Sequence, residues 1–140
     1  MRILFDTNVV LDVFLNREPF VEPAARLFDA NAHGTVGGIL GATTVTTIYY
    51  LLDSNRGPTV AHEKVEVLLQ LFDVAGVNRH VLLQAAQSGF ADYEDAVLHG
   101  AAHRAGADGI VTRNAADFSG AGLSVHTPRE LLTILDHRRD

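Results

Sequence analysis

Acidic residues stand at several places in this sequence where an apolar run ends or a helix is expected to begin. They are Asp6, the group Asp92, Glu94 and Asp95, and finally Asp117. Asp6 directly follows the apolar run that ends at Phe5, and Asp117 follows a second run, 109–112. The carboxyl ends of parallel strands meet at one edge of a sheet, so these separated acids are expected to converge there. Carboxylate oxygens are ligands that suit Mg²⁺ or Mn²⁺ better than zinc.

Each of these acids also has an ordinary structural explanation. Asp6 could serve only as a helix cap, although Thr7 and Asn8 are expected to take that role. Acidic side chains in the first turn of a helix are stabilised by its dipole, which alone could account for Glu94 and Asp95. The acid that follows the second apolar run could be a turn residue. Carboxylates held close together repel one another unless a cation neutralises them, and this favours a metal site.

The elements that must position these acids alternate between strands and helices. Apolar runs predict five strands, at 2–5, 35–40, 74–77, 109–112 and 123–126. Helical spacing and helix-starting residues predict helices at 7–15, 20–33, 41–55, 59–72, 79–89, 93–105 and from 128 onward. Strands that alternate with helices form a parallel sheet covered on both faces. The sequence therefore predicts a single α/β domain over residues 1–140.

The composition is that of a globular domain rather than of a membrane protein or a disulfide scaffold. The chain has 140 residues, enough for one core, and it contains no cysteine. It shows no signal peptide and no apolar run of membrane-spanning length, so a cytoplasmic protein without membrane contact is expected. A net charge of −6 argues against a general nucleic-acid binder but is compatible with an enzyme that binds cations through carboxylates.

Four stretches together resemble the PIN domain, a family of metal-dependent ribonucleases that includes the toxins of VapBC toxin–antitoxin pairs. They are Asp6-Thr7-Asn8-Val9-Val10-Leu11-Asp12, Asp92-Tyr93-Glu94-Asp95-Ala96-Val97, Ile110-Val111-Thr112-Arg113-Asn114 with Asp117-Phe118, and Val125-His126-Thr127-Pro128. Their order and spacing cover nearly the whole chain. The resemblance implies a three-layer α/β/α fold with a central, mostly parallel sheet of four to five strands.

The resemblance also implies an activity, namely hydrolysis of RNA phosphodiester bonds by an endoribonuclease that uses Mg²⁺ or Mn²⁺. Matched by position, Asp6 is the first family acid, Asp95 the third and Asp117 the fourth, and these are the expected catalytic and metal-binding residues. Supporting roles follow for Asn8, beside the first acid, and for Thr112 and Asn114, near the fourth. A bound cation would lower the pKa of its water and stabilise charge on the phosphate.

The second family acid is missing from this chain. Its position corresponds to Thr47, whose neutral hydroxyl is a poorer ligand for a hard cation than a carboxylate. Asp53, six residues further on, does not share a helix face with Thr47. Either Asp92 or Glu94 supplies the missing ligand, or metal binding is weaker, or the domain has become a non-catalytic PIN-like binding module.

The remaining expectations concern binding. Arg113 could hold a phosphate of the substrate RNA by a bidentate contact, or it could pair with Asp117 or Glu94. A toxin of this family implies an antitoxin protein that blocks the site, and the resemblance makes a homodimer plausible.

Overall fold

The computed structural model of the protein describes residues 1–118 and 122–138. Its strands are β1 (Arg2–Phe5), β2 (Gly37–Gly41), β3 (Asp73–Ala75), β4 (Gly109–Val111) and β5 (Ser124–His126). Its helices are α1 (Thr7–Phe14), α2 (Val21–Ala32), α3 (Ala42–Arg56), α4 (Pro58–Leu71), α5 (Arg79–Ala86), α6 (Tyr93–Arg104) and α7 (Pro128–Arg138), with a 3₁₀ turn, η1, at Ala115–Phe118. Among these residues, no helix is both long enough and apolar enough to cross a membrane.

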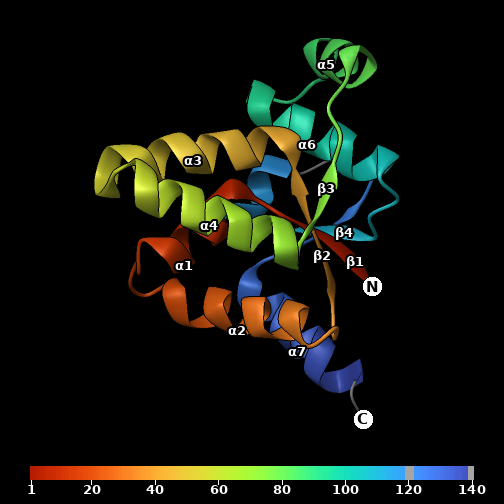
Figure 1. Ribbon diagram of the computed structural model, residues 1–140. Helices are drawn as coiled ribbons and strands as arrows, with labels where there is room; N and C mark the ends of the chain where they lie inside the picture. Colours follow the sequence, from red (N-terminus) through yellow and green to blue (C-terminus); the bar gives the residue numbers. More distant parts are fainter. Residues whose placement is uncertain (119–121, 139–140) are drawn as a thin grey trace.

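The five strands form one parallel sheet in the order β3-β2-β1-β4-β5 (Figure 1). The first strand of the chain lies at the centre, and the chain then builds the sheet outward on one side and later on the other. The two neighbours of β1 are followed by α3 and by η1, so the chain leaves the sheet next to the start of α1 at both places. The predicted α/β class and parallel sheet are confirmed.

Side chains that alternate along the central strands fill two separate cores. Phe5 and Val111 belong to the core beneath α1, α2, α3, α4 and α7, whereas Leu4 and Ile110 belong to the core beneath α5 and α6. Figure 1 shows these two groups of helices on opposite sides of the strands. Because both faces of the sheet are covered at its centre, β4 and most of β1 are buried and apolar, which is the pattern expected for buried parallel strands.

A glycine at the end of β2 allows α6 to approach the sheet. A Cβ atom on Gly41 would lie 2.5 Å from the Cδ2 atom of Leu98, a distance that no packed pair of carbon atoms tolerates. Leu98 is fully buried about one turn after Asp95. The absence of a side chain at Gly41 therefore lets the beginning of α6 lie beside the carboxyl end of the sheet.

The predicted boundaries differ from the observed ones mainly at α5 and η1. The helix expected to reach Gly89 ends at Ala86, where the Ser88 hydroxyl donates to the Ala85 carbonyl at 2.8 Å and Gln87 is the C-cap residue. Serine side chains near a helix end compete for backbone groups in this way and favour termination. The turn η1 was not predicted from the sequence.

Candidate active site

Asp6 is a buried carboxylate at the central point of the carboxyl edge of the sheet. Its backbone N–H still donates to the Val111 carbonyl of β4, at 2.9 Å, so its position is fixed by the last ladder bond of the sheet. The Thr112 hydroxyl donates to the Asp6 Oδ2 atom at 2.7 Å. Only 7% of the Asp6 surface is exposed. Burial raises the pKa of Asp6, while the bonds from Thr112 and from the backbone of Thr7 oppose that rise.

The same residue caps α1, which corrects the expectation that Thr7 and Asn8 would do so. The Asp6 Oδ1 atom accepts a hydrogen bond from the Thr7 backbone N–H at 2.8 Å, and the Asp6 backbone is extended, as N-cap residues require. The Thr7 hydroxyl instead pairs with the Thr44 hydroxyl of α3 at 2.9 Å. Each carboxylate oxygen of Asp6 thus has one protein donor and a further lone pair free for a ligand.

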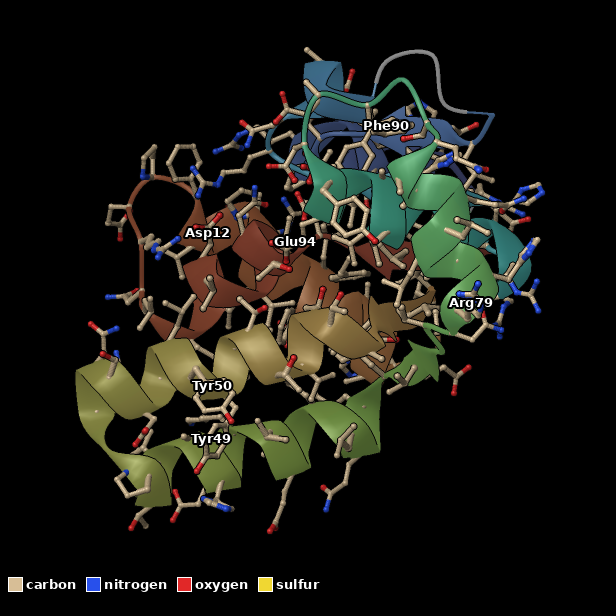
Figure 2. The ribbon with its side chains drawn as sticks, turned by 90° about the horizontal axis from the view of Figure 1, so that it is seen from above. Asp12, Tyr49, Tyr50, Arg79, Phe90 and Glu94 are labelled. Atoms are coloured by element: carbon tan, nitrogen blue, oxygen red, sulfur yellow. The ribbon has the colours of Figure 1, made fainter. Side chains whose placement is uncertain are left out.

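The first turn of α6 brings further acids to the same edge. Asp92 is the N-cap residue, and its Oδ1 atom accepts from the Asp95 backbone N–H at 3.0 Å. This cap fixes the turn on which Glu94 and Asp95 stand, and the dipole of α6 favours their negative charge. Figure 2 shows Glu94 near the start of α6 and Asp12 on α1, with Tyr49 and Tyr50 extending from α3.

These elements enclose a pocket of about 290 Å³, which we call the acid pocket. It is lined by Asp6, Thr7, Asn8, Leu11, Thr47, Asp92, Glu94, Asp95, Asn114 and Asp117. All of the acids proposed from the sequence therefore face one cavity, together with Asn8, Thr47 and Asn114. Thr112 is fully buried behind it and acts on the pocket through its bond to Asp6.

The acid pocket contains several carboxylates that repel one another, with too little positive charge nearby to balance them. Partial burial, followed by repulsion from Asp6, Asp92, Asp117 and Glu94, raises the pKa of Asp95 to about 7. Burial also raises the pKa of Glu94, with Asp92 and Asp6 adding to the effect. These mutual effects show that the acids interact electrostatically across the pocket. At neutral pH, some of this negative charge must be neutralised by a proton or by a cation.

The donor atoms of the acid pocket fit a hard divalent cation. They are oxygens of carboxylates, hydroxyls and amides, the set that Mg²⁺ and Mn²⁺ prefer. The Asn8 Oδ1 atom is buried and has no hydrogen-bond partner among the described residues, which leaves an acceptor beside Asp6 for a ligand. Within residues 1–118 and 122–138, no three acidic or histidine side chains already form a cluster that could hold a metal ion.

Thr47 lies at the acid pocket, as expected for the position that corresponds to the second family acid. It lies on the face of α3 that lines the acid pocket, where it offers a hydroxyl in place of a carboxylate. Asp53, further along α3, does not line the pocket. Of the two residues proposed to replace the missing acid, Asp92 already uses one carboxylate oxygen for its cap bond, whereas no hydrogen bond or ion pair of Glu94 is found in the described structure.

Arg113 is not paired with Asp117 or Glu94, and that part of the expectation is wrong. Its Nε atom lies 2.9 Å from the Oδ2 atom of Asp12, and its guanidinium carbon lies 4.1 Å from the centre of the Phe20 ring. Arg113 does not line the acid pocket, although its positive charge is close enough to oppose the rise in the pKa of Asp6. Its proposed contact with a substrate phosphate stays a prediction.

Asp12 is a residue of this region to which no role was assigned from the sequence. Its side chain is 1% exposed, and its Oδ1 atom lies 3.8 Å from the Nη1 atom of Arg17, in addition to the contact with Arg113. The sequence does contain a signal, because Asp12 falls between Leu11 and Val13 on a short, mostly apolar helix. A charge in such a place needs a buried partner.

Comparisons with known proteins agree with this fold. Residues 2–116 match the family model of the PIN domain, whereas the search of curated proteins gives no match.

Several solved structures contain chains of similar fold. FitAcB from Neisseria gonorrhoeae is 23% identical, with a TM-score of 0.70, covering 91% of this chain and 98% of that one. A toxin–antitoxin complex from Klebsiella pneumoniae is 20% identical, with a TM-score of 0.68, covering 90% and 97%. VapC20 from Mycobacterium tuberculosis, described as a sarcin–ricin loop cleaving toxin, is 17% identical, with a TM-score of 0.67, covering 87% and 96%. At these identities the likeness concerns the fold.

Proposed function

This chain belongs to the PIN-domain family, and we propose that it is an endoribonuclease that hydrolyses RNA phosphodiester bonds with the help of Mg²⁺ or Mn²⁺. The observation that carries the proposal is the acid pocket itself. Asp6, Asp95 and Asp117 come from three separate parts of the chain and face one cavity. Partial burial, followed by repulsion from Asp6 and the other acids of the pocket, raises the pKa of Asp95 to about 7, so the pocket favours binding of a positive species.

The residues of the acid pocket have distinct roles in this proposal. Asp6 is the most rigidly held of the proposed metal ligands, because it accepts a hydrogen bond from Thr112 and caps α1. Asp95 and Asp117 are the more exposed ligands, and a cation would draw them toward Asp6. When bound, Mg²⁺ or Mn²⁺ supplies an activated water and stabilises negative charge on the phosphate. Asn8, with its unpartnered Oδ1 atom, orients a ligand or a water beside Asp6.

Glu94 is the residue that we propose as a substitute for the missing second acid. It lines the acid pocket, and the pKa of Glu94 is raised by burial and by its acidic neighbours. Asp92 could also offer its second oxygen, but its Oδ1 atom holds the first turn of α6, whereas neither oxygen of Glu94 accepts a hydrogen bond among the described residues, so Glu94 is the less constrained ligand. The Thr47 hydroxyl completes the wall of the pocket as a neutral donor or acceptor.

We further propose that the protein is the toxin of a toxin–antitoxin pair, with an antitoxin as its partner. The fold likeness to a toxin–antitoxin complex and to a toxin described as cleaving the sarcin–ricin loop supports this choice. The RNA substrate of this chain is not specified by that likeness. Formation of a homodimer stays a prediction.

A second function is favoured by one observation, the hydroxyl of Thr47 where the family has an acid. If Glu94 does not replace that acid, the domain would bind RNA or a protein partner without cutting RNA. The two functions differ in what they require of the acid pocket. Hydrolysis requires the carboxylates to hold a cation, whereas binding alone does not.

Cleavage of a mixed single-stranded RNA pool by purified protein separates the two. We expect cleavage in Mg²⁺ or Mn²⁺, none in excess chelator, and none with the Asp6→Asn variant. Asparagine caps helices as well as aspartate does, so this variant keeps α1 intact while removing the charge. Glu63→Gln, an exposed change on α4, is the matched control and should cleave normally. Metal-independent cleavage, or equal cleavage by Asp6→Asn, would refute the proposal.

A further inference from the structure

A second cavity, of about 320 Å³, opens beside the acid pocket, and we call it the proline pocket. Its walls come from the loop before α2 together with the first turn of α2, from the segment after β4, and from the beginning of α7 with the residue before it. It is lined by Pro19, Phe20, Pro23, Arg113, Thr127, Pro128 and Arg129. Flat apolar rings and two guanidinium groups therefore share one cavity. None of these residues lines the acid pocket.

Arg113 is fixed in the wall of this pocket by contacts on two sides. The buried carboxylate of Asp12 lies 2.9 Å from its Nε atom, and the Phe20 ring lies against its guanidinium plane, with the guanidinium carbon 4.1 Å from the ring centre. The Asp12 contact engages Nε and not the two terminal nitrogens. A quarter of the Arg113 side chain is still exposed and the residue lines the pocket, so a ligand in the pocket can contact it.

The backbone after β4 joins the two pockets. Thr112 bonds to Asp6, Arg113 lines the proline pocket, and Asn114 lines the acid pocket. Arg113 and Asn114 are consecutive residues, so one short segment of backbone contributes to the walls of both cavities. Arg113 is also close enough to Asp6 to lower its pKa. A polymer whose phosphodiester lies at the acids would therefore have Arg113 close to its next nucleotide.

We propose that the proline pocket binds one nucleotide of the RNA, next to the phosphodiester that the acids cut. The base would pack on Phe20, which is 39% exposed in spite of its contact with Arg113, and the phosphate would lie between Arg113 and Arg129. Aromatic rings bind bases of single strands by stacking, and guanidinium groups bind phosphate oxygens in pairs. This inference rests on the proposed function, because it takes RNA as the substrate.

Arg129 can change partners at little cost. Its Nη1 atom lies 4.0 Å from the Oε2 atom of Glu22, and both side chains are more than half exposed. Exposed ion pairs of this length are screened by water and contribute little, so a phosphate could replace Glu22. A protein with a net charge of −6 then offers the RNA a local positive site beside its acids. The two arginines of the proline pocket favour a negatively charged occupant, and RNA has that charge.

Binding of RNA by non-cleaving protein tests the inference independently of catalysis. In the Asp6→Asn background, the affinity for a fluorescein-labelled, mixed-sequence RNA decamer is measured by fluorescence anisotropy at several salt concentrations. The added variants are Phe20→Ala and Arg129→Gln. Their controls are Tyr50→Ala and Arg79→Gln, which replace an exposed aromatic ring on α3 and an arginine on α5; Figure 2 shows both residues apart from Asp12.

We expect Phe20→Ala to weaken RNA binding by about five- to hundredfold, the usual loss for one stacked base. Arg129→Gln should weaken it less and should reduce the slope of log affinity against log salt by about 0.7, as the loss of one phosphate contact does. Both controls should bind RNA as the background does. Circular dichroism establishes that all variants are folded.

The outcomes distinguish this inference from the proposed function. If the wild-type protein cleaves RNA but both pocket variants bind RNA like the controls, the nuclease stands and the nucleotide pocket is overturned. A pocket that takes a partner peptide instead of RNA would give that result. If the wild-type protein never cleaves RNA, yet binding is lost in Phe20→Ala, the nuclease fails and the nucleotide pocket is supported. Absence of RNA binding in the background protein overturns the pocket as well.

Discussion

Replacing Asp95 by asparagine should stabilise the metal-free protein at neutral and alkaline pH. In the folded protein the pKa of Asp95 is raised from 3.8 to about 7, by burial and by four neighbouring acids. The folded state therefore holds a proton more tightly than the unfolded state does. As the pH rises from about 4 to about 7, that proton must be released, and the free energy of unfolding falls. Asparagine is nearly the same shape and carries no charge at any pH.

The size of the effect follows from the same pKa. A change from 3.8 to about 7 corresponds to about 4 kcal/mol if it is expressed in full. Asp95 is only partly buried, so water screens the repulsion, and we expect about 1–2 kcal/mol between pH 5 and pH 8. For a chain of this length, that corresponds to a fall in Tm of about 4 °C for each kcal/mol.

Urea unfolding in excess chelator, at pH 5 and at pH 8, measures this difference. The wild-type protein should be less stable at pH 8, whereas Asp95→Asn should lose most of that dependence and exceed the wild type at pH 8. Glu63→Gln, on the exposed side of α4, should follow the wild type at both values. Adding Mg²⁺ at pH 8 should stabilise the wild type by mass action and Asp95→Asn much less. A wild-type protein that is equally stable at both pH values would refute this description of the acid pocket.

Three further substitutions test other parts of the account. Thr47→Glu restores a carboxylate to the wall of the acid pocket and should tighten Mn²⁺ binding about tenfold by calorimetry; unchanged affinity would show that α3 contributes no ligand. Thr112→Val removes the 2.7 Å bond to Asp6 and should cost about 1–3 kcal/mol in urea unfolding at pH 7, where an unchanged stability would mean that the bond is dispensable. Phe5→Ala should cost about 3–5 kcal/mol, because the ring packs edge-on against two other phenylalanines; a loss below about 1 kcal/mol would contradict the packing.

Most of the fold could be predicted because the local signals and the tertiary environment agree. The strands β1 and β4 are covered on both faces, so they appear in the sequence as uninterrupted apolar runs. Pro128 begins α7 as a proline in a first helical turn does. The meeting of Asp6 and Asp117 follows from neighbouring parallel strands that end at one edge, whereas the acids at the start of α6 follow another helix and reach the acid pocket through the packing of α6 on the sheet.

The parts that could not be predicted depend on contacts between distant segments. Nothing local in the sequence connects Asp12 with Arg113, which meet only because β4 lies beside β1. The cap of α1 stayed open between Asp6 and the pair Thr7 and Asn8, because no local pattern shows that a strand-end carboxylate bonds to the next backbone N–H and to Thr112 at the same time. The proline pocket could not be predicted from the sequence either, because its walls come from three separate segments.

The central claim is that the acids of this pocket jointly hold a divalent cation. Titration of the protein with Mn²⁺, followed by the electron paramagnetic resonance signal of the free ion, tests it most directly. The account predicts that the wild type and Glu63→Gln remove Mn²⁺ from solution equally, and that Asp6→Asn and Asp95→Asn each weaken this binding at least tenfold. Equal Mn²⁺ binding by all four proteins would contradict the claim, because it would place the ion somewhere other than among these carboxylates.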